Sequence, residues 1–132
     1  MNEKNPCALI PGISGQDGTY LAELLLRKNY KIIGITRNIE TTKEKLPFEL
    51  KNRIDLVSWD FTNQQKIIDI LLDNHPDEIY NFAAYSSGVG MYDNPIDISK
   101  INGLSVTLIL EAIRLIDPDI RFCQASSSEM YG

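Results

Sequence analysis

The stretch PGISGQDG, residues Pro11 to Gly18, decides how the rest of this sequence is interpreted. Its three glycines are spaced three residues apart, and most of the residues between them are polar. Taken alone, such a cluster is typical of a surface turn. Its neighbours favour a second interpretation, because an apolar run at residues 7–10 precedes the stretch and a helical pattern over residues 19–28 follows it.

Between a strand and a helix, each glycine has a physical use. Gly12 permits a tight turn, Gly15 lets a pyrophosphate approach the backbone, and Gly18 lets the helix and the strand pack closely. The N–H groups and the dipole at the start of the helix then favour the anion. The stretch therefore predicts a dinucleotide-binding loop, with a purely structural turn as the alternative. The residues expected at the cofactor are Gly12, Ser14, Gly15, Gln16, Asp17 and Gly18.

Strand and helix patterns alternate along the whole chain. Strands are expected at residues 7–10, 31–36, 54–59, 78–84 and 120–125, and helices at 19–28, 63–74 and 98–115. Residues 38–53 are polar and are interpreted as a loop with at most a helical turn. The alternation predicts an α/β fold, a doubly wound parallel sheet of the Rossmann type with strand order 3-2-1-4-5 and helices on both faces. Residues 1–132 would form one dinucleotide-binding domain.

The end of the second expected strand indicates which dinucleotide is bound. NAD-binding folds place an acidic residue about 20 positions past the glycines, where it holds the ribose 2′-hydroxyl. Here Arg37 stands at that place, and no acidic residue follows before Glu40. An arginine suits the additional phosphate of NADP, so we expect NADP rather than NAD, with a solvated strand-end arginine as the alternative.

The third and fourth strands end in further candidate residues. Asp60 could accept a hydrogen bond from the adenine amine, with Phe61 against the ring, or Asp60 could equally cap the helix that follows. Ala83 and Ala84 would leave room for the cofactor, or they could simply pack under a helix.

Composition excludes several classes of function. The chain of 132 residues has a net charge of −5, which argues against nucleic acid as a partner. No apolar run approaches the roughly 20 residues that span a bilayer, so we expect a cytoplasmic protein without a membrane partner. Cys7 and Cys123 are expected on strands too far apart for a disulfide, and both are predicted to be reduced and buried. His75 is expected to be solvated, and no metal site is expected.

Several of these motifs together resemble the extended short-chain dehydrogenase/reductase family and, within it, the GDP-mannose 4,6-dehydratases. The matching pieces are GQDG with its continuation to Leu25, EIYNFAA at residues 78–84, LEAIR at 110–114, and QASSSEMYG at 124–132. The resemblance covers nearly the whole chain. It implies oxidation of a nucleotide sugar at C4 by NADP⁺, loss of water across C5 and C6, and return of the hydride to C6.

The resemblance also implies roles for individual residues. Ser127 would hydrogen-bond the C4 oxygen, and Glu129 would take the C5 proton and help to expel the C6 hydroxyl. Tyr85 would lie at the cofactor, and the substrate would lie near Ser86, Ser87 and Ser128. From the residues alone, the run from Ser126 to Glu129 could equally be a polar loop with a helix-capping serine.

The chain departs from the family pattern at three positions that bear on the ligand. Pro11 stands where the family usually has threonine, which removes a backbone donor before the loop. Tyr85 and Ser87 stand where Gln and His are common, which leaves the sugar open and suggests a related GDP-sugar.

A further departure concerns the proton relay, which needs a tyrosine followed four residues later by a lysine. None of the six tyrosines has this partner. We therefore expect a nucleotide-binding portion of a longer, homo-oligomeric enzyme, or a shortened product, that lacks the sugar-binding part and cannot complete the dehydration alone. The alternatives are a nucleotide-sugar 4-epimerase and a non-catalytic NADP(H)-binding module.

Overall fold

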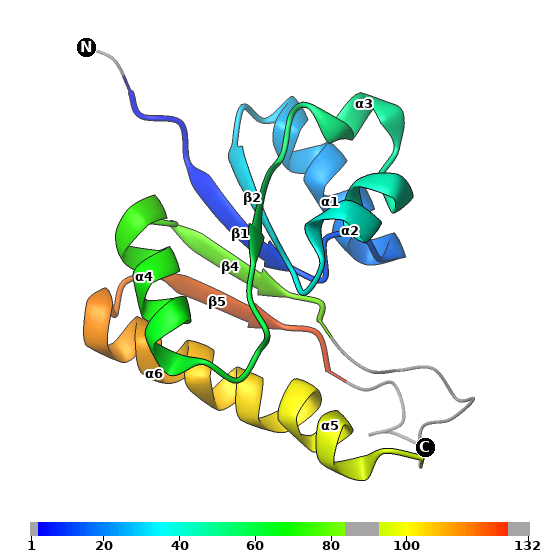
Figure 1. The fold of residues 1–132 in the computed structure, drawn as a ribbon. Helices are drawn as coiled ribbons and strands as arrows, with labels where there is room; N and C mark the ends of the chain where they lie inside the picture. The colour runs from blue at the N-terminus through cyan, green and yellow to red at the C-terminus, as the bar shows by residue number, and fades with distance from the viewer. Residues whose placement is uncertain (1–2, 84–92, 127–132) are drawn as a thin grey trace.

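Five parallel strands form one sheet in the computed structural model, which describes residues 3–83 and 93–126. The strands are β1 (Cys7–Pro11), β2 (Lys31–Thr36), β3 (Asp55–Ser58), β4 (Glu78–Asn81) and β5 (Arg121–Gln124). Their order is β3-β2-β1-β4-β5 (Figure 1). The chain builds outward from β1 to β3 and then returns to add β4 and β5 on the other side of β1. This confirms the predicted doubly wound sheet.

Helices cover both faces of the sheet. One face carries α1 (Gln16–Arg27), α2 (Ile39–Lys45) and α3 (Phe48–Lys51), and the other carries α4 (Gln64–Asn74) and α6 (Ser105–Ile116) (Figure 1). A short helix, α5 (Pro95–Ser99), and a π-helical turn (Lys100–Leu104) lead directly into α6. In the part of the chain that the structure describes, no helix is both long and apolar enough to cross a membrane.

The central strand β1 is buried along its whole length. Leu9 packs in the cluster that contains Ile109 of α6, whereas Ile10 packs in the cluster that contains Ala22 of α1. Successive side chains of a strand point to opposite faces, so both faces of β1 need apolar residues. This explains why the sequence before the glycine loop is continuously apolar rather than alternating.

The stretch 38–53, predicted to be a loop, instead contains the two short helices α2 and α3. The Asn38 side chain caps α2 by accepting a hydrogen bond from the Thr41 N–H at 3.0 Å. Leu46 and Leu50 are buried against the face that α1 covers. Each helix is too short for its periodicity to stand out among polar residues, which is why the sequence did not predict them.

Other predicted boundaries shift by a few residues. α1 begins at Gln16 rather than at residue 19, because Gly15 already occupies its N-cap position. The helix expected over residues 98–115 begins at Pro95 and includes the π-helical turn. β4 ends at Asn81, short of the predicted residue 84.

The two cysteines are free, as predicted, but they differ in burial. Cys7 is buried in β1, and burial raises the pKa of its thiol. Cys123 is exposed, so the prediction that both are buried is wrong. Cys123 lies on the edge strand β5, and α1, α2 and α3 cover the other end of that face (Figure 1).

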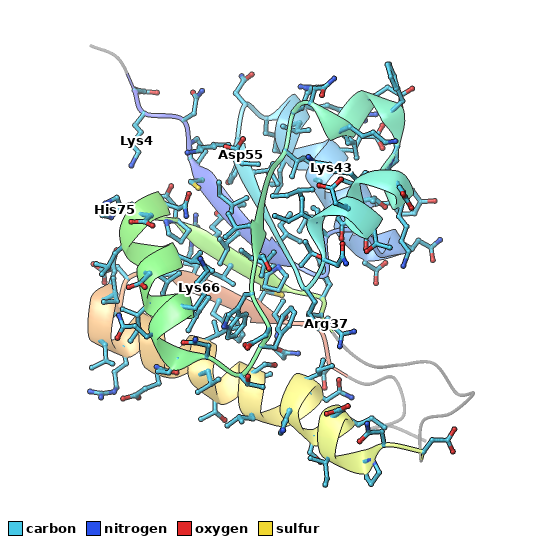
Figure 2. The ribbon with its side chains drawn as sticks, viewed as in Figure 1. Lys4, Arg37, Lys43, Asp55, Lys66 and His75 are labelled. Carbon is cyan, nitrogen blue, oxygen red and sulfur yellow. The ribbon has the colours of Figure 1, made fainter. Side chains whose placement is uncertain are left out.

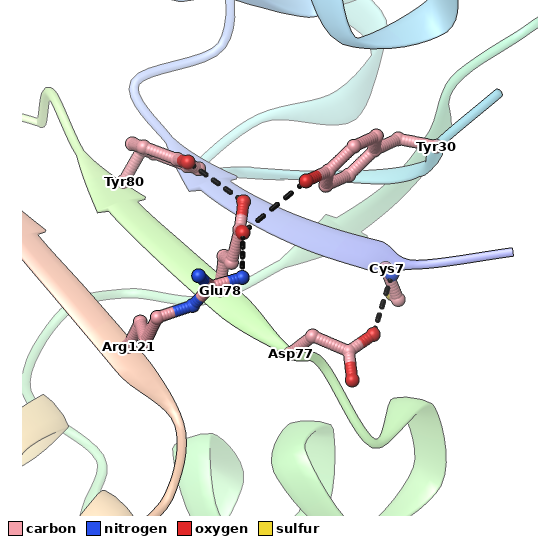
Figure 3. Close-up of polar contacts among 6 residues, drawn as sticks. All are labelled: Cys7, Tyr30, Asp77, Glu78, Tyr80 and Arg121. Carbon is pink, nitrogen blue, oxygen red and sulfur yellow. Dashed lines mark hydrogen bonds and ion pairs between the residues drawn. The ribbon is translucent and has the colours of Figure 1, made fainter. Parts of the chain in front are cut away.

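A buried carboxylate ties together the amino ends of the strands (Figure 3). Glu78 accepts hydrogen bonds from the Tyr80 hydroxyl at 2.7 Å and from the Tyr30 hydroxyl at 3.2 Å, and it pairs with Arg121. Nearby, Asp77 accepts from the Cys7 N–H at 2.8 Å. Three donors on one carboxylate offset the cost of burying its charge. The Glu78 hydrogen bond, and then burial, raises the pKa of Tyr80 to about 12.

This shift predicts how stability changes at alkaline pH. The folded-state pKa of Tyr80 lies above the ordinary tyrosine value of 10.0, so its contribution to stability is fully present below pH 10 and is lost as pH rises through about 12. Tyr80→Phe should lower the free energy of unfolding by about 1–2 kcal/mol at pH 8 and flatten its pH dependence above pH 10. Urea denaturation across this range measures both effects. The exposed Tyr20 serves as control, since Tyr20→Phe should leave the stability at pH 8 unchanged. Parallel curves for the wild type and Tyr80→Phe would contradict the prediction.

Candidate functional site

The glycine loop makes a turn in which backbone packs directly on backbone. Gly12 has a φ of +81°, and a Cβ built there would lie 2.6 Å from the amide nitrogen of Ala83. The Gly12 N–H donates to the carbonyl of Ile35 at 3.2 Å, and its carbonyl accepts from the Gly15 N–H at 3.1 Å. Both its conformation and its neighbours therefore require glycine at position 12.

The other two glycines of the loop have different surroundings. A Cβ on Gly18 would lie 2.5 Å from the Gly12 carbonyl oxygen and 3.0 Å from the Ile13 Cα, so glycine is needed there for α1 to pack on the loop. A Cβ on Gly15 would meet only the Gly12 carbonyl, at an ordinary 3.5 Å. Its φ of −74° suits any residue. No contact within the described chain therefore explains a glycine at position 15.

The first turn of α1 has no side-chain cap. Gly15 stands at its N-cap and carries no side chain, whereas Asn38 and Asn63 cap α2 and α4 by accepting backbone N–H groups. The first N–H groups of a helix have no partner inside the helix, and the helix dipole makes this end positive. Gln16 and Asp17 are exposed at this end of α1.

A pocket of about 330 Å³ opens beside the loop, at the carboxyl ends of the strands. Figure 2 shows Arg37 at this edge of the sheet, and Lys4 and His75 at the opposite edge. The end of β2 and the segments that follow β1, β2, β3 and β4 line the pocket, together with α2 and the π-helical turn. The lining residues are Gly12, Ile13, Ser14, Gly15, Ile35, Thr36, Arg37, Lys45, Phe61, Phe82, Ala83 and Ile101.

The segment after β3 contributes one ring to this pocket. Phe61 has a φ of +67° and is buried, and its ring centroid lies 4.7 Å from that of Trp59. The preceding Asp60 is exposed, and its Oδ1 accepts the N–H groups of Thr62 at 2.8 Å and of Asn63 at 3.0 Å. These hydrogen bonds lower the pKa of Asp60. Asp60 therefore fixes the turn that leads into α4, whereas the cap of α4 itself is Asn63, whose side chain accepts from the Lys66 N–H at 2.9 Å.

The buried Asn81 fixes the backbone at the floor of the pocket. Its Oδ1 accepts from the Ala83 N–H at 3.2 Å, and its Nδ2 donates to the Gln124 side chain at 2.8 Å. The Phe82 N–H donates to the Pro11 carbonyl at 2.9 Å. β1, β4 and β5 are thus held in register where the loop begins.

Comparison with known proteins assigns the chain to a family. Residues 9–132 match the sequence profile of the family described as GDP-mannose 4,6 dehydratase. The chain belongs to this family. The GDP-mannose 4,6-dehydratase of Vibrio cholerae serotype O1 is 38% identical and covers 100% of this chain, which matches 37% of that relative. The human GDP-mannose 4,6 dehydratase is 34% identical, over 100% of this chain and 38% of the relative. The chain thus spans little more than a third of the length of these dehydratases.

Solved structures confirm the fold of this family member. UDP-glucose 4-epimerase from Brucella ovis, in complex with NAD, superposes with a TM-score of 0.79 at 20% identity, over 96% of this chain and 37% of that one. UDP-glucose 4-epimerase from Thermotoga maritima, with UDP-glucose, gives a TM-score of 0.79 at 17% identity, over 92% of this chain and 38% of that one. At such identities the likeness shows the shared fold alone.

Six of the residues predicted to contact the cofactor line the pocket beside the glycine loop. They are Gly12, Ser14, Gly15, Arg37, Phe61 and Ala83. Gln16, Asp17, Gly18 and Asp60 lie next to it, with Gly18 buried beneath the loop. The remaining predicted residues lie outside the described part of the chain, namely Ala84, Tyr85, Ser86, Ser87, Ser127, Ser128 and Glu129.

Sequence reasoning did not predict the other six lining residues, which are Ile13, Ile35, Thr36, Lys45, Phe82 and Ile101. Lys45 was hidden in the stretch interpreted as a loop, and the Asn38 cap is the signal that could have revealed its helix. Ile101 reaches the pocket from the π-helical turn, where the buried Ser105 hydroxyl donates to the Ile101 carbonyl. π-Helical turns are frequent at functional sites, but their position is not encoded in hydrophobic periodicity.

The two interpretations of Asp60 predict different results for one substitution. Asp60→Ala should lower the free energy of unfolding by about 1 kcal/mol at pH 7, because it removes an acceptor of two backbone N–H groups. The folded-state pKa of Asp60 lies below 3.8, so this contribution is present above that pH and disappears as pH falls through the lowered pKa. Urea denaturation at pH 7 and pH 3 should show a larger loss at pH 7 than at pH 3. Asp60→Asn, which keeps an oxygen acceptor, should be affected less. Unchanged stability with weaker dinucleotide binding would favour the adenine role instead.

Proposed function

We propose that this chain binds NADP(H) in the pocket beside the glycine loop and supplies the cofactor-binding part of a GDP-mannose 4,6-dehydratase. The observation that carries the proposal is Gly15, a glycine that neither backbone conformation nor packing requires, at the uncapped start of α1. An absent Cβ there leaves space for a pyrophosphate to reach the backbone. Relatives named as GDP-mannose 4,6-dehydratases support the dehydratase part of the proposal, and structural neighbours solved with NAD support dinucleotide binding.

Within this proposal, the residues of the chain divide the work. The N–H groups at the start of α1 hold the pyrophosphate, Arg37 holds the 2′-phosphate, and Phe61 and Ala83 shape the walls. The bound cofactor would supply a hydride acceptor for C4 of the sugar and the same hydride for C6. β5 ends at Gln124 at this edge, and Ser127 and Glu129 follow in the sequence. Ser127 would hydrogen-bond the C4 oxygen, while Glu129 would move the proton at C5.

The substrate side of the proposal rests on the family pattern. Ser86, Ser87 and Ser128 would contact a GDP-sugar, with Tyr85 next to the cofactor. No tyrosine in these residues is followed four positions later by a lysine. We therefore infer that dehydration needs groups beyond those in the 132 residues. The whole enzyme is proposed to be a cytoplasmic homo-oligomer, for which the two free cysteines and the family resemblance are the support.

A nucleotide-sugar 4-epimerase is the second candidate, because structural neighbours carry that name. Epimerisation at C4 needs no base at C5, so Glu129 favours dehydration. A third candidate, a non-catalytic NADP(H)-binding module, would use the same pocket without the chemistry at Ser127 and Glu129.

A matched pair of glycine variants tests the binding site. Gly15→Ala should weaken NADP⁺ binding by about tenfold or more, since a methyl group would enter the space of the pyrophosphate, and should change the free energy of unfolding by less than about 1 kcal/mol. Gly18→Ala should instead cost about 1–3 kcal/mol of stability, because its Cβ would meet the Gly12 carbonyl at 2.5 Å. Calorimetric titration and urea denaturation measure the two effects. Unaltered binding by Gly15→Ala would refute the site.

A second prediction separates dehydration from epimerisation in the protein with any natural continuation of the chain. Glu129→Gln should retain oxidation of the sugar at C4 but slow the loss of water about 10²- to 10⁴-fold. The substitution removes the carboxyl group that takes the C5 proton and helps to expel the C6 hydroxyl. Assays that follow reduced cofactor and dehydrated product separately provide the measurement. Glu23→Gln, on the exposed face of α1, is the control. Normal dehydration by Glu129→Gln would show that another group moves the proton.

A further inference from the structure

Two of the described residues that line the pocket beside the glycine loop carry cationic side chains. Arg37 follows β2, and Lys45 lies in the last turn of α2. Among the described residues that line the pocket, none is Asp or Glu. The chain as a whole carries 18 acidic and 13 basic residues. Two basic lining residues without an acidic one are therefore unexpected from the composition. A pyrophosphate at the start of α1 does not by itself explain why both Arg37 and Lys45 line this pocket.

The position of Lys45 is fixed by contacts on both sides of it. The Thr36 and Thr42 hydroxyl oxygens lie 2.6 Å apart and tie α2 to the end of β2, while Asn38 caps the first turn. Thr42 is 4% exposed and Leu46 is 3% exposed, so the helix is anchored before and after Lys45. The backbone at Lys45 therefore cannot move far, and the side chain projects from a rigid position beside Arg37.

A structural explanation for Lys45 exists and can be separated from a binding role. Cations in the last turn of a helix are favoured by the helix dipole, and Lys43 and Lys45 both lie in that turn of α2. The two lysines differ in their surroundings. Lys43 lies 4.0 Å from Glu40 and away from the pocket, whereas Lys45 lines the pocket and pairs with no carboxylate of the described residues. The dipole explains both lysines equally, so it does not explain this difference.

We propose that Lys45 is a specificity-determining residue that acts with Arg37 to bind the 2′-phosphate of NADP(H). The inference rests on the proposed function, and it adds a second, independently placed contact to the ribose end of the site. In this fold the cofactor's adenine ribose lies at the carboxyl end of the second strand, and Arg37 and Lys45 both line the pocket at that end. The planar guanidinium can bind phosphate through two N–H groups, and the flexible ammonium adds a point charge. The 2′-hydroxyl of NAD would find no carboxylate acceptor among the described lining residues.

Calorimetric titration of the protein, with any natural continuation of the chain included, tests the proposal using NADP⁺ and NAD⁺ as separate ligands. Lys45→Gln should weaken NADP⁺ binding about tenfold and leave NAD⁺ binding within about twofold, since only NADP⁺ carries the phosphate. It should also reduce the salt dependence of NADP⁺ binding. Lys43→Gln removes a charge from the same helical turn and should change neither affinity by more than about twofold. Lys45→Glu should shift the preference towards NAD⁺.

Each result decides the proposal. If Lys45→Gln weakens the binding of NADP⁺ and of NAD⁺ equally, the effect is one of general charge and the proposal is overturned. An unchanged affinity for NADP⁺ would also overturn it, and so would an equal loss of affinity in Lys43→Gln. If the unsubstituted protein binds NAD⁺ as tightly as NADP⁺, 2′-phosphate recognition by both Arg37 and Lys45 is refuted, while dinucleotide binding stands. If it binds neither ligand, the proposed function itself fails and the role of Lys45 fails with it.

Discussion

The backbone contact among Gly12, Gly18 and Ala83 is the constraint on which the rest of this structure depends. Three segments meet there with no side chain between them, namely the end of β1, the first turn of α1 and the chain after β4. A Cβ on Gly12 would meet the Ala83 backbone at 2.6 Å, and one on Gly18 would meet the Gly12 carbonyl at 2.5 Å. The direction of α1 and the floor of the pocket both follow from this packing. The start of a helix is thereby brought to the edge of the sheet where ligands bind in such folds.

The three glycines of the loop separate into two kinds when each is examined for what it touches. Gly12 and Gly18 are required by the folded chain itself, so their presence says nothing about a ligand. Gly15 has an ordinary backbone conformation, and a Cβ there would meet only the Gly12 carbonyl oxygen, at an ordinary 3.5 Å. No contact among the described residues requires a glycine there, whereas the proposed pyrophosphate contact would. The glycine spacing alone cannot make this distinction, which is why the pattern is a weak motif until the packing is known.

The sheet could be predicted from the sequence because short apolar runs alternate with amphipathic stretches, and parallel strands joined by helices permit few arrangements. The exposure of Cys123 could not be predicted in the same way. It depends on what covers the edge strand β5 rather than on the strand's own residues. The helix α2 was missed because seven mostly polar residues give little periodicity. With α2 missed, Lys45 could not be placed, because the contact between Thr36 and Thr42 that positions it joins residues of two elements.

Charged side chains are treated differently at the amino and the carboxyl ends of the strands, called here the amino edge and the carboxyl edge of the sheet. At the amino edge, Glu78 is buried and receives hydrogen bonds from Tyr30, Tyr80 and Arg121, which is how a charge is made compatible with a folded core. At the carboxyl edge, Arg37 and Lys45 share a pocket without an acidic lining residue in the described chain. Neighbouring like charges oppose folding, and a chain with 18 acidic residues does not lack carboxylates to pair with them. Local features that lower stability, and that no other contact of the fold offsets, are expected where a protein binds its ligand. The amino edge thus stabilises the fold, whereas the two cations at the carboxyl edge have no carboxylate partner among residues 3–83 and 93–126, which agrees with the anionic ligand proposed above.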